Sequence, residues 1–264
     1  MRQPDTRYWD SVALTCESDE STSNRLWRSH SDALNVDLVA RWVRNGRFRR
    51  VLKTDLFDEV LGGGLYPFLR ERAGTFVGVD LSTVMVQKAR GKHGVLPAVA
   101  GDVRQLPFAD QSFDLIVSDS TLDHFERFEE LAQALREVHR VLRSGGQLVM
   151  TLDNLYNPVV AVRNALPIRL LRRIGIVPYF VGVTYGPRRL RRVLESTGFE
   201  IRELDAIVHA PRVLAIPAAR LVSRHGSRRL QERYSRALMA FESMAKWPTR
   251  FVSGHFIAVS AFRV

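Results

Sequence analysis

Cysteine is almost absent from this sequence of 264 residues, in which Cys16 is the only one. A single cysteine excludes an intrachain disulfide framework and a zinc site built from several cysteines, and no metal is predicted to bind. Long apolar runs are also missing, since no stretch approaches the ~18 uncharged residues of a membrane-spanning helix. The best candidate, 213–222, is shorter and contains Arg220. These absences predict a cytoplasmic protein that is soluble or at most peripheral to a membrane.

Lysine is scarce too, so the formal net charge of +11 comes almost entirely from arginine. Three arginine-rich runs lie in the second half, at 168–173, 187–192 and 224–229. They fit an anionic partner such as a membrane surface or an acidic substrate, or, as we favour, solvated helix faces. They lack the interleaved aromatic residues of a base-stacking surface, which argues against nucleic acid. The apolar and basic segment 166–177 suits a peripheral lipid contact or, as we favour, a half-buried helix.

Strand-like and helix-like segments alternate along most of the chain. Compact apolar runs predict seven strands, at 51–56, 75–81, 95–102, 113–120, 147–153, 198–208 and 251–264. Helices are expected at 32–43, 66–72, 82–92 and 125–142. Ser82 is a plausible N-cap, and the glycines of "RSGG" (143–146) predict a C-terminal stop. The order predicts an α/β doubly wound fold with a mainly parallel seven-stranded sheet and an antiparallel last strand, in which the two late strands close the sheet with an antiparallel edge.

Segments outside this pattern predict cap elements around a single domain. Residues 1–47 are expected to form an N-terminal helical cap, in which the polar stretch 16–24 is a loop or lid. Residues 48–264 form the ligand-binding domain, with a cap insertion at about 154–197 and a helical insertion at about 211–250. Ligands of doubly wound folds bind over the carboxyl ends of the strands. The residues that follow the strands are therefore the candidate site.

Three blocks of sequence carry a family resemblance. They are "FVGVDLSTVMVQKAR" (76–90), "GDVRQLPFADQSFDLIVS" (101–118) and "ALREVHRVLRSGGQLVMT" (134–151). In this order they resemble blocks of the class I S-adenosylmethionine-dependent methyltransferases, and most of all the small-molecule group that includes quinone-biosynthesis enzymes. The resemblance covers roughly residues 48–153. It implies S-adenosylmethionine as the cofactor and a small-molecule substrate.

The resemblance assigns roles to residues that follow the second and third strands. Asp80 is expected to accept hydrogen bonds from the ribose hydroxyls of the cofactor. Asp102 is expected to accept from the adenine amine, while the backbone N–H of Val103 donates to a ring nitrogen. Leu81 and Leu106 either sandwich the adenine or belong to the core.

The loop after the first strand, "VLKTDLFDEVLGGG" (51–64), departs from the usual D/E-x-G-x-G-x-G pattern of the family. Spacing from the second strand favours a register that starts at Asp58. The apolar run 51–52 favours a longer turn, in which Asp55 or Glu59 accepts from the cofactor's ammonium. Both registers keep Gly62 and Gly64, where glycine allows close backbone approach. We therefore expect Asp55, Asp58 and the two glycines to bind the cofactor.

The methyl end of the cofactor is expected beside "SDSTLDHF" (118–125), just past the fourth strand. His124 is the candidate base or a pocket-lining residue, with Asp123 to orient it, and Asp119 is a weaker candidate for the pocket. Cap residues that could cover cofactor and substrate come from both ends of the chain. They are Trp27 and His30 in the N-terminal cap and Tyr179, Phe180 and Tyr185 in a glycine- and proline-containing loop.

The predicted function is methyl transfer from S-adenosylmethionine to a small molecule, apolar or acidic, by in-line displacement, with O-methylation slightly preferred over C- or N-methylation. A nucleotide-cofactor oxidoreductase is the alternative enzyme, but residues 62–67 lack the third glycine of a dinucleotide fingerprint. A methyltransferase-like domain that binds without turnover is the non-enzyme alternative. The sequence predicts no oligomeric state.

Overall fold

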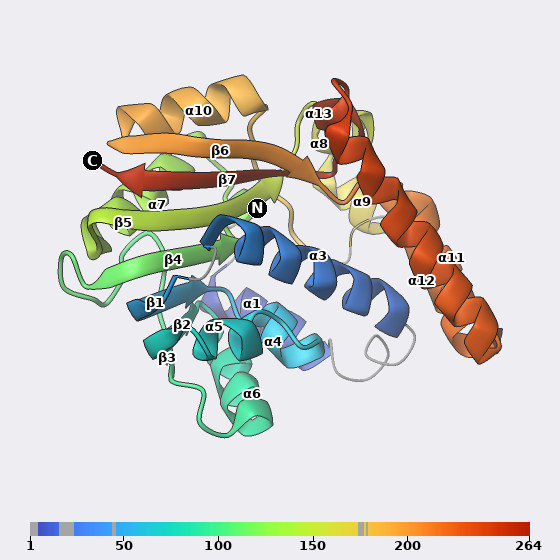
Figure 1. Cartoon of the computed structure of the whole chain (residues 1–264), viewed down its shortest axis with the longest axis horizontal. Coiled ribbons are helices and arrows are strands. Elements are labelled where there is room, and N and C mark those ends of the chain that lie inside the picture. The colour runs from blue at the N-terminus through green and yellow to red at the C-terminus, as the bar shows by residue number, and fades with distance from the viewer. Residues whose placement is uncertain (1–4, 16–23, 44–45, 174–176, 178) are drawn as a thin grey trace.

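The computed structural model of the chain describes residues 5–15, 24–43, 46–173, 177 and 179–264. Its centre is a seven-stranded sheet in the order β3-β2-β1-β4-β5-β7-β6 (Figure 1). The strands are β1 (Phe48–Thr54), β2 (Ala73–Asp80), β3 (Ala98–Ala100), β4 (Phe113–Asp119), β5 (Leu142–Asp153), β6 (Phe199–Ile207) and β7 (Phe256–Arg263). Neighbouring strands are parallel except at β7, which runs antiparallel to β5 and β6. The predicted doubly wound α/β fold with an antiparallel last strand is confirmed.

The last strand lies inside the sheet and not at its edge. β7 is inserted between β5 and β6, and Ile257 pairs with Leu152 on one side and Ala206 on the other. The edge strand is therefore β6, and the predicted antiparallel edge is the pair of β6 and β7. The inner place of β7 was not predicted, because strand order along the chain does not specify spatial order when a long helical connection separates two strands.

Several strand boundaries also differ from the predictions. β1 covers Phe48–Thr54 where 51–56 was predicted, and β7 begins at Phe256 where residue 251 was predicted. β5 begins at Leu142, directly after α7 (Phe128–Val141), so "RSGG" belongs to the strand and does not end the helix. The pairing of β4 with β5 is irregular here, and Gly145 takes a φ of 69°, which glycine adopts without a Cβ clash. β3 is shorter than expected, since Pro97 has no N–H to extend the ladder.

Successive strand residues alternate between two core layers. Leu52 and Ile116 pack on the side of α7 and α10, whereas Val51 and Leu115 pack on the side of α3, α5 and α6. Both faces of the sheet are thus covered, as near-continuous apolar strands require. Besides α7, the covering helices are α3 (Arg25–Val43), α5 (Tyr66–Arg70), α6 (Thr83–His93) and α10 (Pro187–Ser196).

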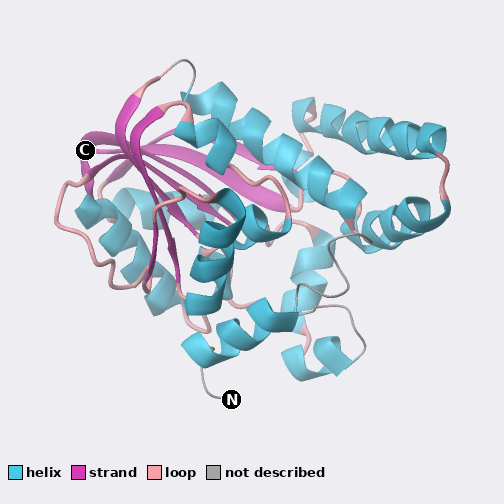
Figure 2. Ribbon diagram, turned by 90° about the horizontal axis from the view of Figure 1, so that it is seen from below, coloured by secondary structure: helices cyan, strands magenta, loops and turns pink. Residues whose placement is uncertain are grey.

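The remaining helices lie around the carboxyl ends of the strands or beyond the sheet. They are α1 (Thr6–Thr15), α4 (Phe57–Leu61), η1 (Leu122–His124), α8 (Pro158–Ala165), α9 (Ile168–Arg173), α11 (Arg212–His225), α12 (Arg228–Phe241), η2 (Glu242–Lys246) and α13 (Arg250–Ser253). Figure 2 shows α11 and α12 as a helical hairpin that projects beyond the sheet. Helix α3 begins at Arg25, well before its predicted start at residue 32. The predicted loop 16–24 lies outside the described residues except for Asn24.

Candidate functional site

A cavity of about 870 Å³ lies over the carboxyl ends of the parallel strands. The last residues of β1, β2, β4 and β5 all line it, namely Thr54, Asp80, Asp119 and Asp153. Side chains of α1, α3, α8 and α11 complete its walls. Small-molecule pockets usually measure about 300–1,000 Å³, so this volume leaves room for a cofactor and a second ligand.

The structure decides between the two registers of the loop after β1. The strand contains Val51 and ends at Thr54, so the longer turn holds and Asp55 is the first residue after the strand. Asp55 has a left-handed φ of 71°, and its carboxylate accepts from the N–H of Phe57 at 2.7 Å. Such a local hydrogen bond offsets part of the cost of this conformation. Asp55 and Asp58 both line the cavity.

Lys53 points into the protein, away from the cavity. Its Nζ lies 2.8 Å from the carboxylate of Glu59 and donates to the carbonyl of Asp55 at 2.7 Å. Burial lowers the pKa of Lys53, but the charges of Glu59 and of the neighbouring aspartates Asp55, Asp119 and Asp58 together outweigh burial and raise this pKa above its ordinary value. Glu59 also accepts from the N–H of Leu65 at 2.9 Å. Glu59 is therefore a buried partner of the loop and does not line the cavity.

Gly62 and Gly64 lie outside the residues that line the cavity. A Cβ on Gly62 would approach Oδ2 of Asp32 to 2.4 Å. Gly64 has a φ of 60°, and a Cβ there would lie 2.7 Å from Oε1 of Glu59. Close packing against two carboxylates explains both glycines in this structure, and their predicted contact with a cofactor stays a prediction.

Four carboxylates border the cavity beside β1, β2 and β4: those of Asp55, Asp58, Asp80 and Asp119. Burial raises the pKa of Asp80 to about 6 and, together with the charge of Asp58, that of Asp119 to about 7. Burial and the neighbouring Asp80 raise the pKa of Asp55 well above its ordinary range. Carboxylates that are crowded away from water resist ionisation unless a cation balances them. This group of residues, the acidic cluster, therefore favours a positively charged ligand.

Asp80 holds the backbone on both sides of the β2 terminus. Its Oδ2 accepts from the N–H of Leu56 at 2.9 Å, and its Oδ1 accepts from the N–H of Ser82 at 2.8 Å. The predicted N-cap of α6 is confirmed, because Ser82 Oγ accepts from the N–H of Met85 at 3.1 Å. A carboxylate has about four acceptor positions, so Asp80 keeps capacity for ribose hydroxyls. Leu81 lines the cavity next to it.

Asp102 and Val103 also line the cavity, but Asp102 already has a partner. The backbone, Nε and Nη2 N–H groups of Arg104 donate to its carboxylate at 2.5–3.0 Å. Arg104 is held in turn by Glu130 at 2.8 Å. Asp102 can accept from an adenine amine only by sharing its oxygens with Arg104. Leu106 is buried in the core and does not line the cavity.

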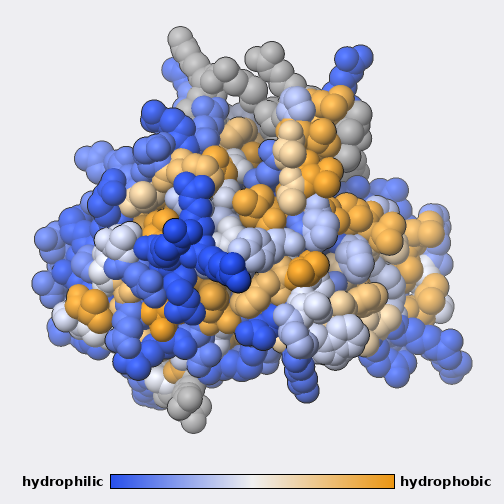
Figure 3. Space-filling model, turned by 90° about the horizontal axis from the view of Figure 1, so that it is seen from above, coloured by the Kyte–Doolittle hydropathy of each residue, from blue (hydrophilic) through white to orange (hydrophobic). Residues whose placement is uncertain are grey.

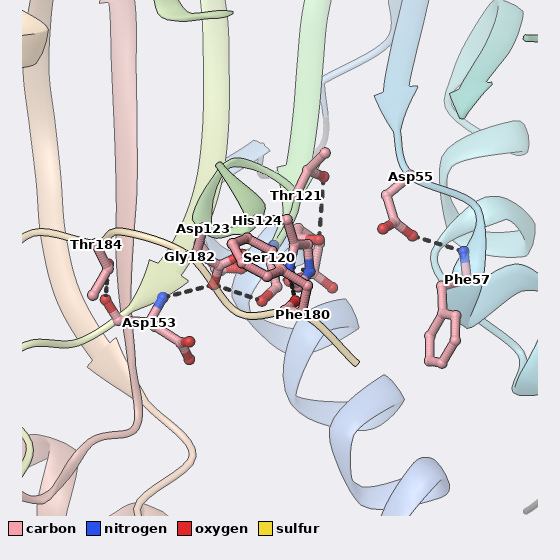
Figure 4. A network of polar contacts seen from close by, with 12 residues as sticks. Asp55, Phe57, Ser120, Thr121, Asp123, His124, Asp153, Phe180, Gly182 and Thr184 are labelled. Atoms are coloured by element: carbon pink, nitrogen blue, oxygen red, sulfur yellow. Dashed lines mark hydrogen bonds and ion pairs between the residues drawn. The ribbon is translucent and has the colours of Figure 1, made fainter. Parts of the chain in front are cut away.

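His124 and Asp123 lie on η1 and face the cavity (Figure 4). Nδ1 of His124 lies 3.0 Å from the carbonyl oxygen of Phe180. Because a carbonyl oxygen only accepts, Nδ1 carries the hydrogen and Nε2 of the neutral ring keeps a free lone pair. Oδ1 of Asp123 lies 3.8 Å from this Nε2. The other oxygen, Oδ2, accepts from Ser120 and from the N–H of Asp153, both at 3.0 Å, which fixes the carboxylate beside the ring.

Helix α3 supplies three polar residues at helical spacing, and the sequence prediction missed their joint role. Arg28 Nη1 lies 2.8 Å from Asp58, and Asp32 accepts from the N–H of Gly63 at 2.8 Å. Asn35 Nδ2 donates to Asp119. These positions, i, i+4 and i+7, share one helix face, so a polar stripe facing the glycine loop was the signal that could have found them.

Of the five predicted cap residues, Trp27 and Tyr179 line the cavity. Burial raises the pKa of Tyr179 to about 12, and its ring lies edge-on to His124 at 5.6 Å between centroids. His30 is buried beside Trp27, and burial lowers its pKa to about 4. Phe180 contributes its carbonyl oxygen to the site, which accepts from Nδ1 of His124. Tyr185 stacks on Phe128 at 4.9 Å in the core. The cavity lining therefore includes neither His30, Phe180 nor Tyr185.

Helix α1 covers the cavity from the N-terminal side. Trp9 lies edge-on to His124 with ring centroids 5.0 Å apart, and Tyr8 Oη accepts from the N–H of Phe180 at 2.7 Å. Asp10 accepts from the Ser82 hydroxyl at 2.6 Å and from the N–H of Val84 at 3.1 Å. These contacts attach α1 both to the start of α6 and to the segment around His124 and Phe180.

The far end of the cavity is mainly apolar. Its walls include Val159 and Val162 of α8 and Val213, Ile216 and Pro217 of α11. We call this region the apolar lobe. Several apolar side chains of α8 and α11 are also exposed at the surface, and Figure 3 shows more apolar surface on the side of the helical hairpin than on the opposite side.

In the part of the chain that the structure describes, no helix combines the length and apolar character needed to cross a bilayer. No group of three or more His, Cys, Asp or Glu side chains there is arranged to hold a metal ion.

Comparison with known proteins links the site to one class of enzyme. Residues 60–150 match the methyltransferase domain family. A malonyl-[acyl-carrier protein] O-methyltransferase of Enterobacter lignolyticus is 33% identical over 48% of this chain and 46% of its own length. A demethylmenaquinone methyltransferase of Corynebacterium kroppenstedtii is 35% identical over 44% of this chain and 48% of its own length. The chain thus spans about half the length of these curated relatives.

Solved structures extend the likeness over the whole fold. An S-adenosylmethionine-dependent methyltransferase of Thermotoga maritima has a TM-score of 0.57 and 16% identity, over 97% of this chain and 99% of that one. The predicted resemblance to S-adenosylmethionine-dependent methyltransferases is confirmed, as is the Rossmann-like fold. The predicted type of enzyme agrees with the domain match and with the names of both relatives.

Proposed function

We propose that the protein transfers a methyl group from S-adenosylmethionine to a small-molecule acceptor, with an oxygen as the preferred methyl-accepting atom. The acidic cluster is the observation that carries the proposal. S-adenosylmethionine bears a sulfonium and an ammonium, and buried carboxylates stabilise such a cation. A dinucleotide carries negative phosphates, which the same carboxylates would repel. The cluster and the domain match therefore favour this function over a nucleotide-cofactor oxidoreductase.

Different residues of the cavity suit different parts of the cofactor. Asp80 would accept from the ribose hydroxyls, while Leu81, Asp102 and Val103 would surround the adenine. Asp55, Asp58 and Asp119 are the candidates for the ammonium and sulfonium charges. When bound, the cofactor supplies an activated methyl group. The protein's task is then to hold the acceptor atom in line with this methyl at about 3 Å.

His124 is the proposed general base for a hydroxyl acceptor. Because Nδ1–H donates to Phe180, Nε2 is the ring nitrogen that would take the proton of the hydroxyl. Asp123 would then stabilise the imidazolium from 3.8 Å. An acceptor that is already anionic needs no base, and for such an acceptor His124 only lines the pocket.

Calorimetric titration with S-adenosylhomocysteine and with NADH tests the cofactor assignment. We expect micromolar affinity for the first ligand and none for the second. Asp80→Ala is expected to weaken S-adenosylhomocysteine binding roughly tenfold to a hundredfold, because charge-assisted hydrogen bonds are lost. Asp37→Ala is the matched control, since Asp37 lies on the exposed face of α3 and pairs with Arg41. Circular dichroism checks the fold, because Asp80 also holds Leu56 and Ser82.

An intact protein that binds NADH but no S-adenosylhomocysteine would contradict the proposal. Binding of S-adenosylmethionine without methyl transfer to any member of a broad acceptor library would instead favour the non-catalytic alternative. Lipid contact through the segment 166–177 and a cytoplasmic location remain predictions. Sedimentation with anionic vesicles tests the first of them.

A further inference from the structure

Five arginines line the cavity, and four of them have polar partners. Arg28 pairs with Asp58, Arg104 with Asp102 and Glu130, Arg163 with Asp153, and Arg220 donates to Asn24. The fifth, Arg212, makes no hydrogen bond or ion pair with any residue in the part of the chain that the structure describes. Among the described residues, Arg212 is therefore the one arginine of the cavity whose N–H groups have no acceptor in the protein.

Arg212 is the first residue of α11 and lies between aromatic rings. Its guanidinium carbon is 5.8 Å from the ring centroid of Trp27 and 5.2 Å from that of Phe256. Aromatic faces attract a guanidinium but accept none of its five N–H groups. Burial lowers the pKa of Arg212, although arginine stays charged in proteins. The side chain is partly exposed and borders the cavity, so its N–H groups can donate to an anion that binds there.

The nearest carboxylate of the protein is not available to meet this need. Asp153 is held by Arg163, and His255 Nε2 lies 3.4 Å from its other oxygen. Among the groups around Arg212, Tyr179 is neutral, since burial raises its pKa to about 12. Arg163 and Arg28 add positive charge nearby. The balance of charge around Arg212 therefore also favours a negatively charged group that belongs to a ligand.

The surroundings of Arg212 describe the rest of that ligand. Val213, Ile216 and Pro217 follow Arg212 on α11 and line the apolar lobe, and Val159 and Val162 of α8 line the same cavity. Burial of apolar surface here contributes about 25 cal/mol for each Å² removed from water. A ligand that fills this lobe is apolar over most of its length and carries its charge at the point where it meets Arg212.

We propose that Arg212 binds the carboxylate of an apolar carboxylic acid, and that the acceptor of the methyl group belongs to this class of molecule. A carboxylate matches the planar fork of a guanidinium and forms two parallel hydrogen bonds with it. The inference rests on the proposed function, because it treats the apolar lobe as the acceptor side of a cofactor cavity. It goes further by naming the group that is recognised and the residue that recognises it.

The test is calorimetric titration of the full-length protein with decanoate and with 4-phenylbutanoate, both with and without saturating S-adenosylhomocysteine. Decan-1-ol is the uncharged comparison for decanoate. We expect the wild-type protein to bind at least one of the acids more tightly than the alcohol. Arg212→Gln is expected to weaken acid binding at least tenfold, because hydrogen bonds to a charged group are lost. Binding of the alcohol and of S-adenosylhomocysteine is expected to stay unchanged.

Arg220→Gln is the matched control, since Arg220 lies on the same helix and borders the same cavity but already donates to Asn24 at 2.8 Å. We expect it to leave acid binding within about twofold of wild type. Failure of both acids to bind the wild-type protein, or an equal loss for acid and alcohol in Arg212→Gln, would overturn the inference. A loss of S-adenosylhomocysteine affinity in Arg212→Gln would also overturn it, because Arg212 would then serve the cofactor.

The two proposals can fail separately in this design. Absence of S-adenosylhomocysteine binding contradicts the proposed function, while the acid titrations of the protein without this ligand still report on Arg212. Thermal unfolding of each variant shows whether a loss of binding comes from a loss of fold.

Discussion

The carboxylates beside the cavity link ligand binding to pH. Burial raises the pKa of Asp80 to about 6 and that of Asp119 to about 7. The folded protein therefore binds protons more tightly than the unfolded chain does. The stability that these two groups contribute is full below about pH 4 and is lost as the pH rises through 6 and 7. A cationic ligand has the opposite preference, because it favours the ionised carboxylates.

We therefore predict that S-adenosylmethionine affinity rises roughly tenfold between pH 5.5 and pH 8, in line with pKa shifts of this size. The rise for S-adenosylhomocysteine should be smaller, because it lacks the sulfonium charge. Calorimetry in two buffers of different ionisation enthalpy would detect the protons released on binding near pH 6. Asp119→Asn should flatten the profile. Equal pH profiles for the two ligands would contradict a role of the acidic cluster in sulfonium recognition.

The buried pair of Lys53 and Glu59 supports the loop below the cavity. Lys53→Met is predicted to lower the free energy of unfolding by about 3–5 kcal/mol, because Glu59 would keep a buried charge without its partner. Lys53→Met combined with Glu59→Gln should recover part of this loss, since glutamine can still accept from the N–H of Leu65. Urea unfolding at pH 7 measures the difference.

The exposed pair of Arg228 and Glu232 provides the control for that experiment. Its side chains are 94% and 59% exposed, and exposed pairs of this kind contribute little. Arg228→Ala should therefore leave the unfolding midpoint nearly unchanged. A double variant no more stable than Lys53→Met would show that the lost stability comes from packing and not from the stranded charge.

At the scale of elements, α3 approaches the glycine loop closely through Asp32. Gly62→Ala is predicted to lower the free energy of unfolding by about 1–3 kcal/mol, the usual cost of overpacking, because its Cβ would lie 2.4 Å from Asp32 Oδ2. Gly63→Ala is the matched control, as its Cβ would lie at an ordinary 3.6 Å. Chemical unfolding of both variants measures the contrast, and Asp32→Ala in the Gly62→Ala background should relieve most of the strain.

Most elements of the sheet could be predicted from the sequence, because buried parallel strands and amphipathic helices leave local periodic patterns. The N-cap at Ser82 and the position of Asp80 at a strand end are local features of the same kind. The inward direction of Lys53 could not be predicted, since it depends on a partner in the following helix. The insertion of β7 beside β5 and the packing of Tyr185 on Phe128 depend likewise on contacts between distant segments.

At the scale of the whole molecule, the cavity is assembled from nearly the full length of the chain. Its lining extends from Trp9 in α1 to Phe256 in β7, whereas the methyltransferase domain match covers residues 60–150. The matched region supplies the ends of β2 and β4, and the segments outside it supply α1, α3, α8 and α11. The features that would distinguish this acceptor site from those of its relatives therefore lie mainly outside the matched region.

Because the site exists only when distant segments are assembled, a cofactor analogue should stabilise the whole fold. S-adenosylhomocysteine at a hundred times its dissociation constant is predicted to add about 2.7 kcal/mol to the free energy of unfolding. For a chain of this size that corresponds to a rise of roughly 5–10 °C in Tm. Differential scanning calorimetry measures this shift, and Asp80→Ala at the same ligand concentration should show a smaller one.

Hydrogen exchange shows which segments of the chain the bound ligand stabilises. Ligand binding should slow exchange in α1 and α3 as well as at the ends of β1 and β2. Helix α1 lines the cavity with Trp9 beside His124, and α3 contacts the acidic cluster through Arg28 and Asn35. Helix α12 borders α11 and contributes no lining residue, so its exchange should change least. Protection confined to residues 60–150 would contradict a cavity built by the caps, and would place the ligand on the matched region alone.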